Sequence, residues 1–310
     1  YNGANLTLYL NGVAQSSNTA TTWAGAANVK LANPITKAIS KASADEVRIF
    51  DRALSSTEVL ALYHAGDAPE LWTPAEITTT AWYDASDNTT ITTVGSVVSR
   101  WDDKSGSGSN ISQSSGGARP SQSTINGRNA INSFQGDYLE TTSLSYTLTT
   151  GALAIGVQRW DDGNYADMWN VSNTANSDLL NMRGDVSGPS DALTCVSKVD
   201  GGQDNFTTSA MDIHINFIGC LTWDTSNSYL YIDGQQTNTA ASGAGPFTVN
   251  DLRVGYVSNS NLDSSVGELI ILEDASTVTR QKLEGYLAWK WSLEANLPSG
   301  HPYKSAPPYK

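Results

Sequence analysis

The sequence LYLNG at residues 8–12 returns as LYIDG at residues 230–234. The sequence DEVRIF at residues 45–50 returns as GELIIL at residues 267–272, with the same spacing and in the same order. Each LY(L/I)(N/D)G segment is a short alternating strand that ends in a dipeptide suited to a tight hairpin turn. An internal repeat indicates that the same structural unit occurs twice, so it is considered before other sequence patterns. The chain is therefore predicted to hold two domains of one type.

The two copies are unequal. Residues 76–310 hold a complete copy, whereas residues 1–66 hold only the C-terminal half of one. Residues 67–75, which contain two prolines, are predicted to be the linker between them. We expect the N-terminal half of the first copy to lie upstream in a longer protein, or in another chain. Residues 1–66 should not fold alone, because half a sandwich leaves an apolar face uncovered.

The charge and the apolar content of the chain exclude several classes of partner. The chain has 310 residues, with 31 acidic and 18 basic side chains and a formal charge of −13. Such an acidic surface repels phosphate, so nucleic acid and anionic membrane surfaces are not expected partners. No apolar run approaches the length that spans a bilayer, so no membrane insertion is expected. These properties suit an extracellular protein.

Short apolar runs separated by Gly, Ser, Thr and Asn predict many strands joined by tight turns. The period changes after Ser276, where Leu283, Leu287 and Trp291 recur every four residues and predict an amphipathic helix over 278–294. In the first copy, Ser55 and Glu58 form a capping-box pattern that predicts a helix start. The strands expected in the second copy are 96–101, 129–134, 151–160, 165–171, 192–199, 213–223, 228–233, 246–257 and 266–272.

Several motifs resemble those of a known group of domains. LYLNGV at 8–13 and DEVRIFDRALS at 45–55 resemble the laminin-G-like form of the concanavalin A-like jelly roll. WYDASD at 82–87, WDDKSG at 101–106 and GYLAWKW at 285–291 resemble a subgroup found in structural proteins of marine bacteriophages and in secreted bacterial proteins. The resemblance implies an all-β fold of tandem antiparallel two-sheet jelly-roll sandwiches, each closed by a short C-terminal helix. It also implies glycan binding, in some cases with calcium.

Catalysis is not expected, although glycan-cleaving enzymes share this jelly roll. Glycoside hydrolysis needs two carboxylates on one strand face, about 5–10 Å apart. Glu268 and Glu273 are five residues apart, so they point to opposite faces of a strand. The segment Asp212-Ile213-His214 resembles one polysaccharide-lyase motif, but the two accompanying lyase motifs are absent, and a lone histidine in a strand is more often structural. We predict a non-enzymatic protein without a cofactor.

The stretch from residue 160 to residue 170 combines aromatic and acidic side chains and predicts a ligand-binding loop. The candidate ligand-binding residues are Trp160, Asp162, Tyr165 and Trp169. The alternative is a polar hairpin whose two tryptophans are core residues at the strand ends. The candidate calcium ligands are Asp84, Asp87, Asp102 and Asp103, although aspartates in such segments also cap turns.

Two alternatives stay open for Cys195 and Cys220, which are predicted to be either a disulfide between neighbouring strands or two buried thiols. For the whole chain we predict a non-catalytic carbohydrate- or receptor-binding adhesion module on a phage virion surface. The expected partners are a cell-surface glycan or receptor, other virion or surface proteins, and further copies of the chain. The alternatives are a purely structural decoration or spacer module and a secreted bacterial adhesin.

Overall fold

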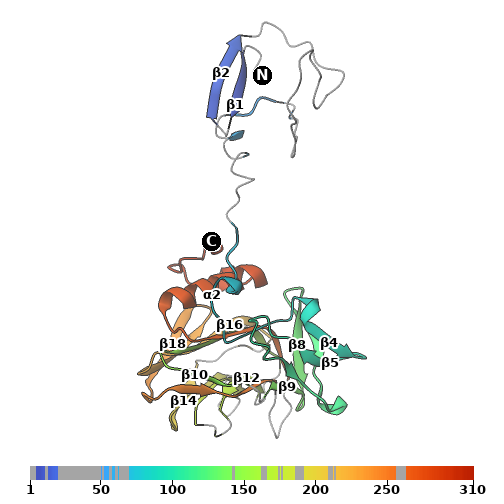
Figure 1. Ribbon diagram of the computed structural model, residues 1–310, viewed down its shortest axis with the longest axis vertical. Coiled ribbons are helices and arrows are strands. Elements are labelled where there is room, and N and C mark those ends of the chain that lie inside the picture. Colours follow the sequence, from blue (N-terminus) through green and yellow to red (C-terminus); the bar gives the residue numbers. More distant parts are fainter. Residues whose placement is uncertain are drawn as a thin grey trace. The chain divides into compact units, whose positions relative to one another are not determined.

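The structure is a computed structural model. It describes residues 5–10, 13–19, 50, 52–55, 58–59, 62, 70–141, 144–161, 166–173, 175, 177–185, 192–208, 212, 214–255 and 263–310. The chain divides into two compact units, Tyr1–Glu70 and Leu71–Lys310. Figure 1 shows both units, which are described separately below.

The described part of the first unit contains the predicted hairpin. Strand β1 (Asn5–Leu10) pairs antiparallel with β2 (Val13–Thr19), and the pairing begins at Leu10 and Val13. The predicted capping box is also present: the Glu58 amide donates to Ser55 Oγ at 3.2 Å, and the Ser55 amide donates to Glu58 Oε2 at 2.8 Å. That this unit is half of a jelly roll stays a prediction.

The second unit is an all-β sandwich of two antiparallel sheets, as predicted. One sheet, here called the helix-side sheet, has its outer face covered by helix α2 (Thr277–Trp291); the other, the open sheet, has no helix on its outer face among the described residues. Strands β5 and β6 pair at one edge and link the two sheets. In spatial order the helix-side sheet contains β18 (Gln235–Ala241), β17 (Asn227–Ile232), β16 (Asn216–Trp223), β11 (Ala152–Trp160), β21 (Asp263–Leu272), β3 (Ala81–Asp84) with β8 (Arg128–Phe134), β7 (Ser121–Ile125), β5 (Val97–Trp101) and β4 (Ile91–Val94).

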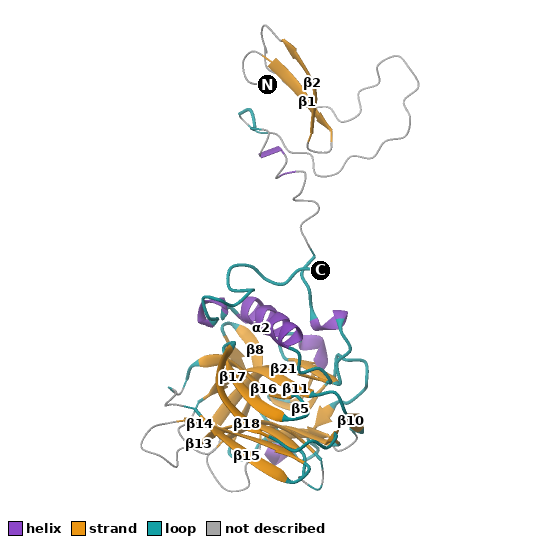
Figure 2. Cartoon of the chain, turned by 90° about the vertical axis from the view of Figure 1, so that its left-hand side faces the viewer, coloured by secondary structure: helices purple, strands orange, loops and turns teal. Residues whose placement is uncertain are grey.

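The open sheet forms the second layer, and Figure 2 shows the two sheets stacked beneath α2. A separate two-stranded ribbon pairs β10 (Tyr146–Leu148) with β19 (Phe247–Val249). In spatial order the open sheet contains β15 (Gly202–Thr207), β14 (Ala192–Val199), β13 (Leu179–Asp185), β12 (Ala166–Ser172), β20 (Asp251–Gly255), β9 (Tyr138–Thr141) and β6 (Ile111–Ser112).

Strand β11 explains why the unit has three layers. Its sequence ALAIGVQRW is an almost continuous apolar run, which is typical of a strand that is covered on both faces. Ala154 faces the core between the two sheets, whereas Leu153 and Ile155 face the core beneath α2. The helix-side sheet therefore contributes to two hydrophobic cores, and the open sheet contributes to one.

Helix α2 confirms the predicted change of period. Ser276 caps its start by accepting a hydrogen bond from the Thr279 amide at 3.3 Å, and Leu283, Leu287 and Trp291 are buried against the sheet. The helix ends three residues before the predicted end at 294. Ser292 adopts a left-handed conformation (φ 55°), which terminates the α-helical hydrogen bonding.

The two cysteines are free, so the disulfide alternative is wrong. Cys195 on β14 faces the core between the sheets, whereas Cys220 on β16 faces the core beneath α2. The helix-side sheet thus separates the two thiols. Burial raises the pKa of Cys195 to about 12 and raises that of Cys220 well above its ordinary value, so both are unreactive at neutral pH.

Candidate functional site

The outer face of the open sheet carries polar side chains that the strand alternation directs away from the core. In β13, Leu180 and Met182 are buried in the core between the sheets, and the intervening Asn181 and Arg183 face outward. A pocket of about 200 Å³ lies on this outer face. It is lined by Asp167, Asn170, Leu179, Asn181, Arg183, Val196, Lys198 and Gln203, which come from strands β12 to β15.

Hydrogen bonds orient the side chains of this pocket. Asn181 Nδ2 donates to Asp167 Oδ1 at 3.0 Å, and Arg183 Nε donates to the Thr194 carbonyl at 2.9 Å. Both bonds tie a pocket side chain to a neighbouring strand. The donors and acceptors of the pocket are therefore held in position by the sheet itself.

The polar surface continues along the sheet beyond the pocket. The strand register places Asn170 beside Arg253 on β20, and Arg253 beside Glu140 on β9. Arg253 Nε lies 2.9 Å from Glu140 Oε2, and its Nη2 lies 3.4 Å from Asp251 Oδ2. An extended ligand that occupies the pocket would therefore meet further polar groups on the same face.

Asp167 is the titratable group in this pocket with a shifted pKa. Burial raises the pKa of its carboxyl to about 6, and the hydrogen bond from Asn181 limits the rise. At neutral pH the carboxylate is ionised and accepts hydrogen bonds. The amides of Asn170 and Gln203 both donate and accept, whereas Arg183 and Lys198 only donate. The pocket can thus bind a ligand rich in hydroxyl groups.

Two of the predicted binding residues are core residues instead. Trp160 is 1 % exposed and Trp169 is fully buried, so neither ring presents a face on which a sugar could stack. Trp169 Nε1 donates to Gln158 Oε1 at 2.9 Å inside the sandwich. Asp162 and Tyr165 lie outside the described residues, and their role in ligand binding stays a prediction. In the sequence, Tyr165 directly precedes β12 and Asp162 lies four residues before its start; β12 carries Asp167 and Asn170.

The four candidate calcium ligands have other partners. Asp84 Oδ2 lies 2.8 Å from Lys290 Nζ and 3.1 Å from Lys104 Nζ, and Asp87 lies 2.8 Å from Lys104 Nζ. Burial works to raise the pKa of Asp84, but Lys290, with help from Lys104, outweighs it, so the pKa is lowered.

The other two aspartates directly follow the end of β5. Asp102 pairs with Arg100, and Asp103 caps a turn by accepting from the Ser105 amide at 2.9 Å and from Ser107 Oγ at 2.7 Å. Within the described ranges, no three acidic, histidine or cysteine side chains converge as metal ligands. The turn-capping alternative therefore describes Asp103, and also Asp84 and Asp87, which accept from the Ser86 and Thr89 amides and are neutralised by lysines.

Glu268 has a structural position that the sequence did not reveal. It is fully buried beneath α2 and accepts four hydrogen bonds. The donors are Trp82 Nε1 at 2.8 Å, Tyr286 OH at 2.9 Å, Lys290 Nζ at 2.7 Å and Trp291 Nε1 at 2.7 Å. The WYDASD and GYLAWKW motifs thus supply the groups that fasten α2 to the sheet. The sequence signal that could have indicated this role is an acidic residue in the otherwise apolar GELIIL segment, together with the tryptophans of the WYDASD and GYLAWKW motifs.

No catalytic arrangement forms around the residues that were considered for one. Glu273 is exposed and accepts a hydrogen bond from the Thr149 amide, whereas Glu268 is buried, so the two carboxylates do not share a site. His214 lies in a turn before β16, with φ 64° and a side chain that is 64 % exposed, rather than within a strand. The predicted strand 213–223 therefore begins three residues later, at Asn216.

On the open sheet, Glu140 lies two strands and three residues from Asp167 by register. Glu140 pairs with Arg253, and Asp167 accepts from Asn181, so the two carboxyl groups have different partners. Among the helices that the structure describes, none has the length and apolar character needed to cross a membrane.

No family model and no curated protein matches this chain. Its structure is similar to the binding domain of Paraclostridial Mosquitocidal Protein 1 (14 % identity, TM-score 0.47, covering 61 % of this chain and 49 % of that one). It is also similar to a Trypanosoma rangeli sialidase (11 % identity, TM-score 0.42, covering 63 % of this chain and 30 % of that one). A third similar structure is that of domains LG4-5 of the mouse laminin α1 chain (11 % identity, TM-score 0.36, covering 43 % of this chain and 38 % of that one). The chain spans about half of the first of these proteins and less of the others. At such low identity the likeness concerns the fold alone.

Proposed function

We propose that the second unit is a non-catalytic carbohydrate- or receptor-binding adhesion module and that the polar pocket of the open sheet is its ligand site. The observation that carries the proposal is the set of side chains around this pocket: a carboxylate, two asparagines, a glutamine, a guanidinium and an ammonium group share one open face. Sugars display neighbouring hydroxyl groups, each of which donates and accepts. A mixed set of fixed donors and acceptors matches that chemistry.

The proposal extends to Asp162 and Tyr165. In the sequence they lie within four residues before the strand that carries Asp167. Tyr165 would add the aromatic face that the pocket lining lacks. Calcium has no part in this proposal, because the pocket binds through amides and charged side chains.

The setting we propose is extracellular, on the surface of a bacteriophage particle, with a cell-surface glycan or receptor as the partner. The motif resemblance supports this setting, and so does the acidic surface. A tandem or oligomeric arrangement suits weak binders, because linked sites raise avidity without new contacts. A structural spacer module and a secreted bacterial adhesin are the competing functions.

Glycan arrays and host-cell binding with the intact chain test the proposal. N170A and Q203A each remove one hydrogen-bonding group from the pocket and should weaken binding about five- to tenfold. Q235A is the matched control, because Gln235 is an equally exposed glutamine on β18 of the other sheet. Blank arrays and no cell binding would favour the spacer function. Binding that survives both pocket variants would move the site to the segment of Asp162 and Tyr165.

A further inference from the structure

A second pocket lies beside helix α2, away from the open sheet. Its volume of about 430 Å³ is within the range of small-molecule sites. The lining comes from the start of the unit, from β8, from α2 and from the C-terminal tail. Its residues are Leu71, Trp72, Thr73, Arg128, Tyr286, Trp289, Lys290, Pro307 and Pro308.

The aromatic rings of this pocket are fixed at their polar ends. Trp289 Nε1 donates to the Tyr303 carbonyl at 2.8 Å, and Tyr286 OH donates to Glu268 at 2.9 Å. Trp72 meets Tyr286 edge to face, with ring centroids 6.3 Å apart at 84°. Trp72 is only 4 % exposed, whereas Tyr286 and Trp289 are partly exposed, so the latter two provide the aromatic surface of the pocket.

The C-terminal tail that forms the opposite wall is also held in place. The Trp72 amide donates to the Pro308 carbonyl at 3.0 Å, and Leu71 pairs with Tyr309 as an antiparallel bridge. Lys304 Nζ donates to two carbonyls that follow α2, Glu294 at 3.0 Å and Ala295 at 2.6 Å. The pocket is therefore formed without a ligand, which lowers the entropic cost of binding.

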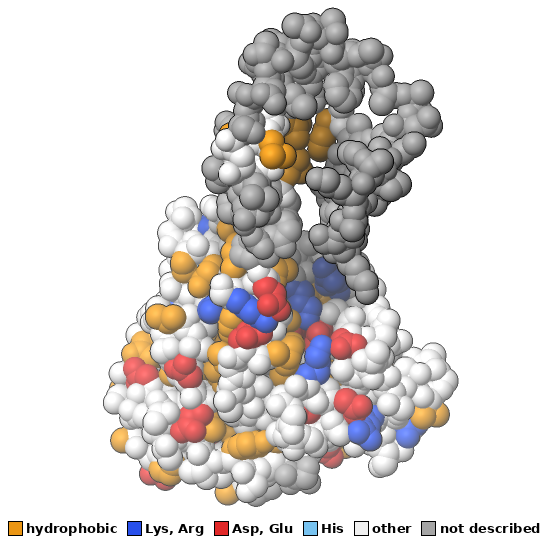
Figure 3. Space-filling view, turned by 45° about the horizontal axis from the view of Figure 1, so that its top comes forward, with side chains coloured by type: hydrophobic (Ala, Val, Ile, Leu, Met, Phe, Trp, Pro, Cys, Tyr) orange, Lys and Arg blue, Asp and Glu red, His pale blue; other side chains and the backbone are white. Residues whose placement is uncertain are grey.

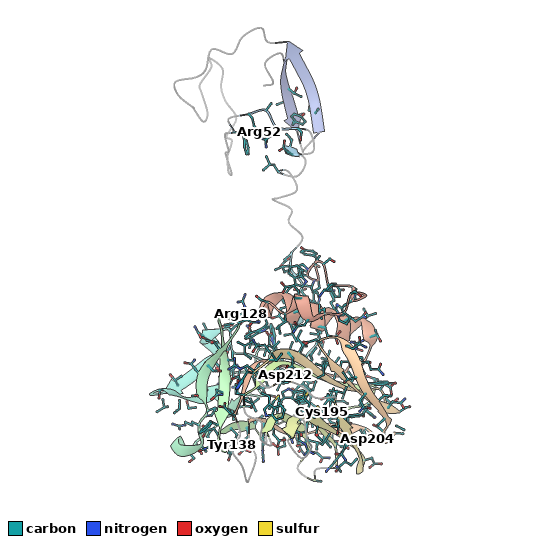
Figure 4. All side chains as sticks on the ribbon, turned by 180° about the vertical axis from the view of Figure 1, so that it is seen from behind. Arg52, Arg128, Tyr138, Cys195, Asp204 and Asp212 are labelled. Atoms are coloured by element: carbon teal, nitrogen blue, oxygen red, sulfur yellow. The ribbon has the colours of Figure 1, made fainter. Side chains whose placement is uncertain are left out.

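The two cationic side chains of the pocket, Lys290 and Arg128, differ in whether they form ion pairs with other residues of the described chain. Lys290 is committed to the protein, because its Nζ lies 2.8 Å from Asp84 and 2.7 Å from Glu268. Arg128 is exposed, and its guanidinium makes no hydrogen bond or ion pair with another residue in the described part of the chain. Figure 4 labels Arg128 on the side of the unit that carries α2.

Arg128 is close enough to the pocket aromatics to influence them. Burial raises the pKa of Tyr286 well above its ordinary value, the Glu268 charge raises it further, and the positive charge of Arg128 opposes both. The guanidinium of Arg128 has no hydrogen-bond or ion-pair partner among the described residues, and in a chain with a formal charge of −13 it is a donor fork available to an anion. Its planar geometry fits a carboxylate in a bidentate manner.

We propose that this pocket binds a uronic acid unit of an acidic polysaccharide. The apolar face of the sugar ring packs on Tyr286 and Trp289, and its carboxylate pairs with Arg128. An aromatic surface beside one free cation favours a ring that carries a single acidic group over a neutral sugar. This site is independent of the polar pocket on the open sheet, which lies on the other side of the sandwich.

Calorimetric titration of the intact chain with a glucuronic acid oligosaccharide, and with a glucose oligosaccharide of equal length, tests the proposal. The acidic oligosaccharide should bind at least about tenfold more tightly, and this preference should weaken as salt is added. R128Q should remove about tenfold of the affinity for the acidic oligosaccharide. R100Q is the matched control, because Arg100 is an exposed arginine of the same sheet outside the pocket, and it should bind like the parent.

Three results would overturn the proposal: equal binding of the two oligosaccharides, unchanged affinity of R128Q, or binding of benzoate but not of the acidic oligosaccharide. The last result would assign the pocket to an aromatic acid. A loss of affinity for the acidic oligosaccharide in N170A but not in R128Q would place that ligand in the polar pocket and overturn the proposal, so failure at one pocket is distinguishable from failure at the other. Thermal melting of R128Q checks that a lost affinity is not lost folding.

Discussion

The two outer faces of the sandwich differ in what covers them and in how their acidic residues are engaged. On the helix-side sheet, the outer face is buried beneath α2, and its acid, Glu268, has four hydrogen-bond donors around it. On the open sheet, no helix among the described residues covers the outer face, and its acid, Asp167, has one donor from a described side chain, Asn181. Figure 3 shows basic and acidic side chains beside one another on part of the surface near α2. One face therefore uses polar groups to fix a layer, whereas the other leaves them available to a ligand.

The difference can be followed in single strands. β11 is apolar at nearly every position because both of its faces are covered. β13 reads LLNMRGD, with Leu180 and Met182 inward and Asn181 and Arg183 outward, because only its inward face packs into a hydrophobic core. The contrast predicts where substitutions damage the fold and where they damage binding.

The largest effect should come from Glu268→Gln. The change replaces one acceptor oxygen by an NH2 group, which faces the N–H and O–H donors of the same buried site, whereas Lys290 keeps Asp84 at 2.8 Å. Because two buried donors lose their acceptor, we expect the free energy of unfolding of the second unit to fall by about 2–4 kcal/mol. Chemical denaturation followed by tryptophan fluorescence measures it.

Glu273→Gln is the matched control for this prediction. Glu273 is exposed and lies just after the end of β21, where it accepts hydrogen bonds from Thr149 and Thr150 at the surface. Its replacement should change stability by about 1 kcal/mol or less. If Glu268→Gln proved as mild as this control, the hydrogen-bonded cluster would not be what fastens α2.

A smaller loss is expected from Gly267→Ala. A Cβ at Gly267 would lie 2.6 Å from the ring of Trp291, so the helix would have to move away from the sheet. Overpacking of this kind costs about 1–3 kcal/mol. Gly116→Ala is the control, because nothing lies within 4 Å of an added Cβ there and the φ angle is not left-handed. Equal melting temperatures for the two variants would show that the α2 layer is loosely packed.

Much of this contrast was visible in the sequence, and part of it was not. The helix and the turn at Asp233-Gly234 were predicted correctly, because a four-residue period and an Asp-Gly pair are local signals; both turn residues have positive φ. The strands that were missed are β3, β4, β6, β7, β9, β10, β13, β15 and β18. Of these, β15 and β18 are largely exposed and polar, so they lack the apolar alternation that marks a half-buried strand.

The binding residues were harder to predict for a different reason. A tryptophan beside acidic residues has the same sequence signature whether its ring points inward or outward. In β12 a register shift between Asp167 and Trp169 places both Met168 and Trp169 in the core, so counting alternate residues fails there. The polar pocket also draws its residues from four strands, and that convergence exists only once the strands are paired.

The smallest predicted effect is the pH dependence of stability that Asp167 gives to the open sheet. The pKa of Asp167 in the folded protein is about 6, above its value of about 3.9 in an unfolded chain, so folding favours its protonated form. Its contribution to stability is therefore fully present below about pH 4 and is lost as the pH rises through 6.

Asp167→Asn should consequently match the parent near pH 4 and exceed it above pH 6, by about 1 kcal/mol or less once solvent screening of a half-buried group is allowed for. Ligand binding at the polar pocket should show the opposite trend. The ionised carboxylate is the better acceptor for sugar hydroxyls, so affinity should rise between pH 5 and 7 in the parent and stay flat in Asp167→Asn. Denaturation and binding titrations on the same two proteins measure both trends. A stability difference that is independent of pH would mean that Asp167 is solvated like an ordinary surface acid, and the open sheet would then lack the desolvated acceptor on which its proposed function depends.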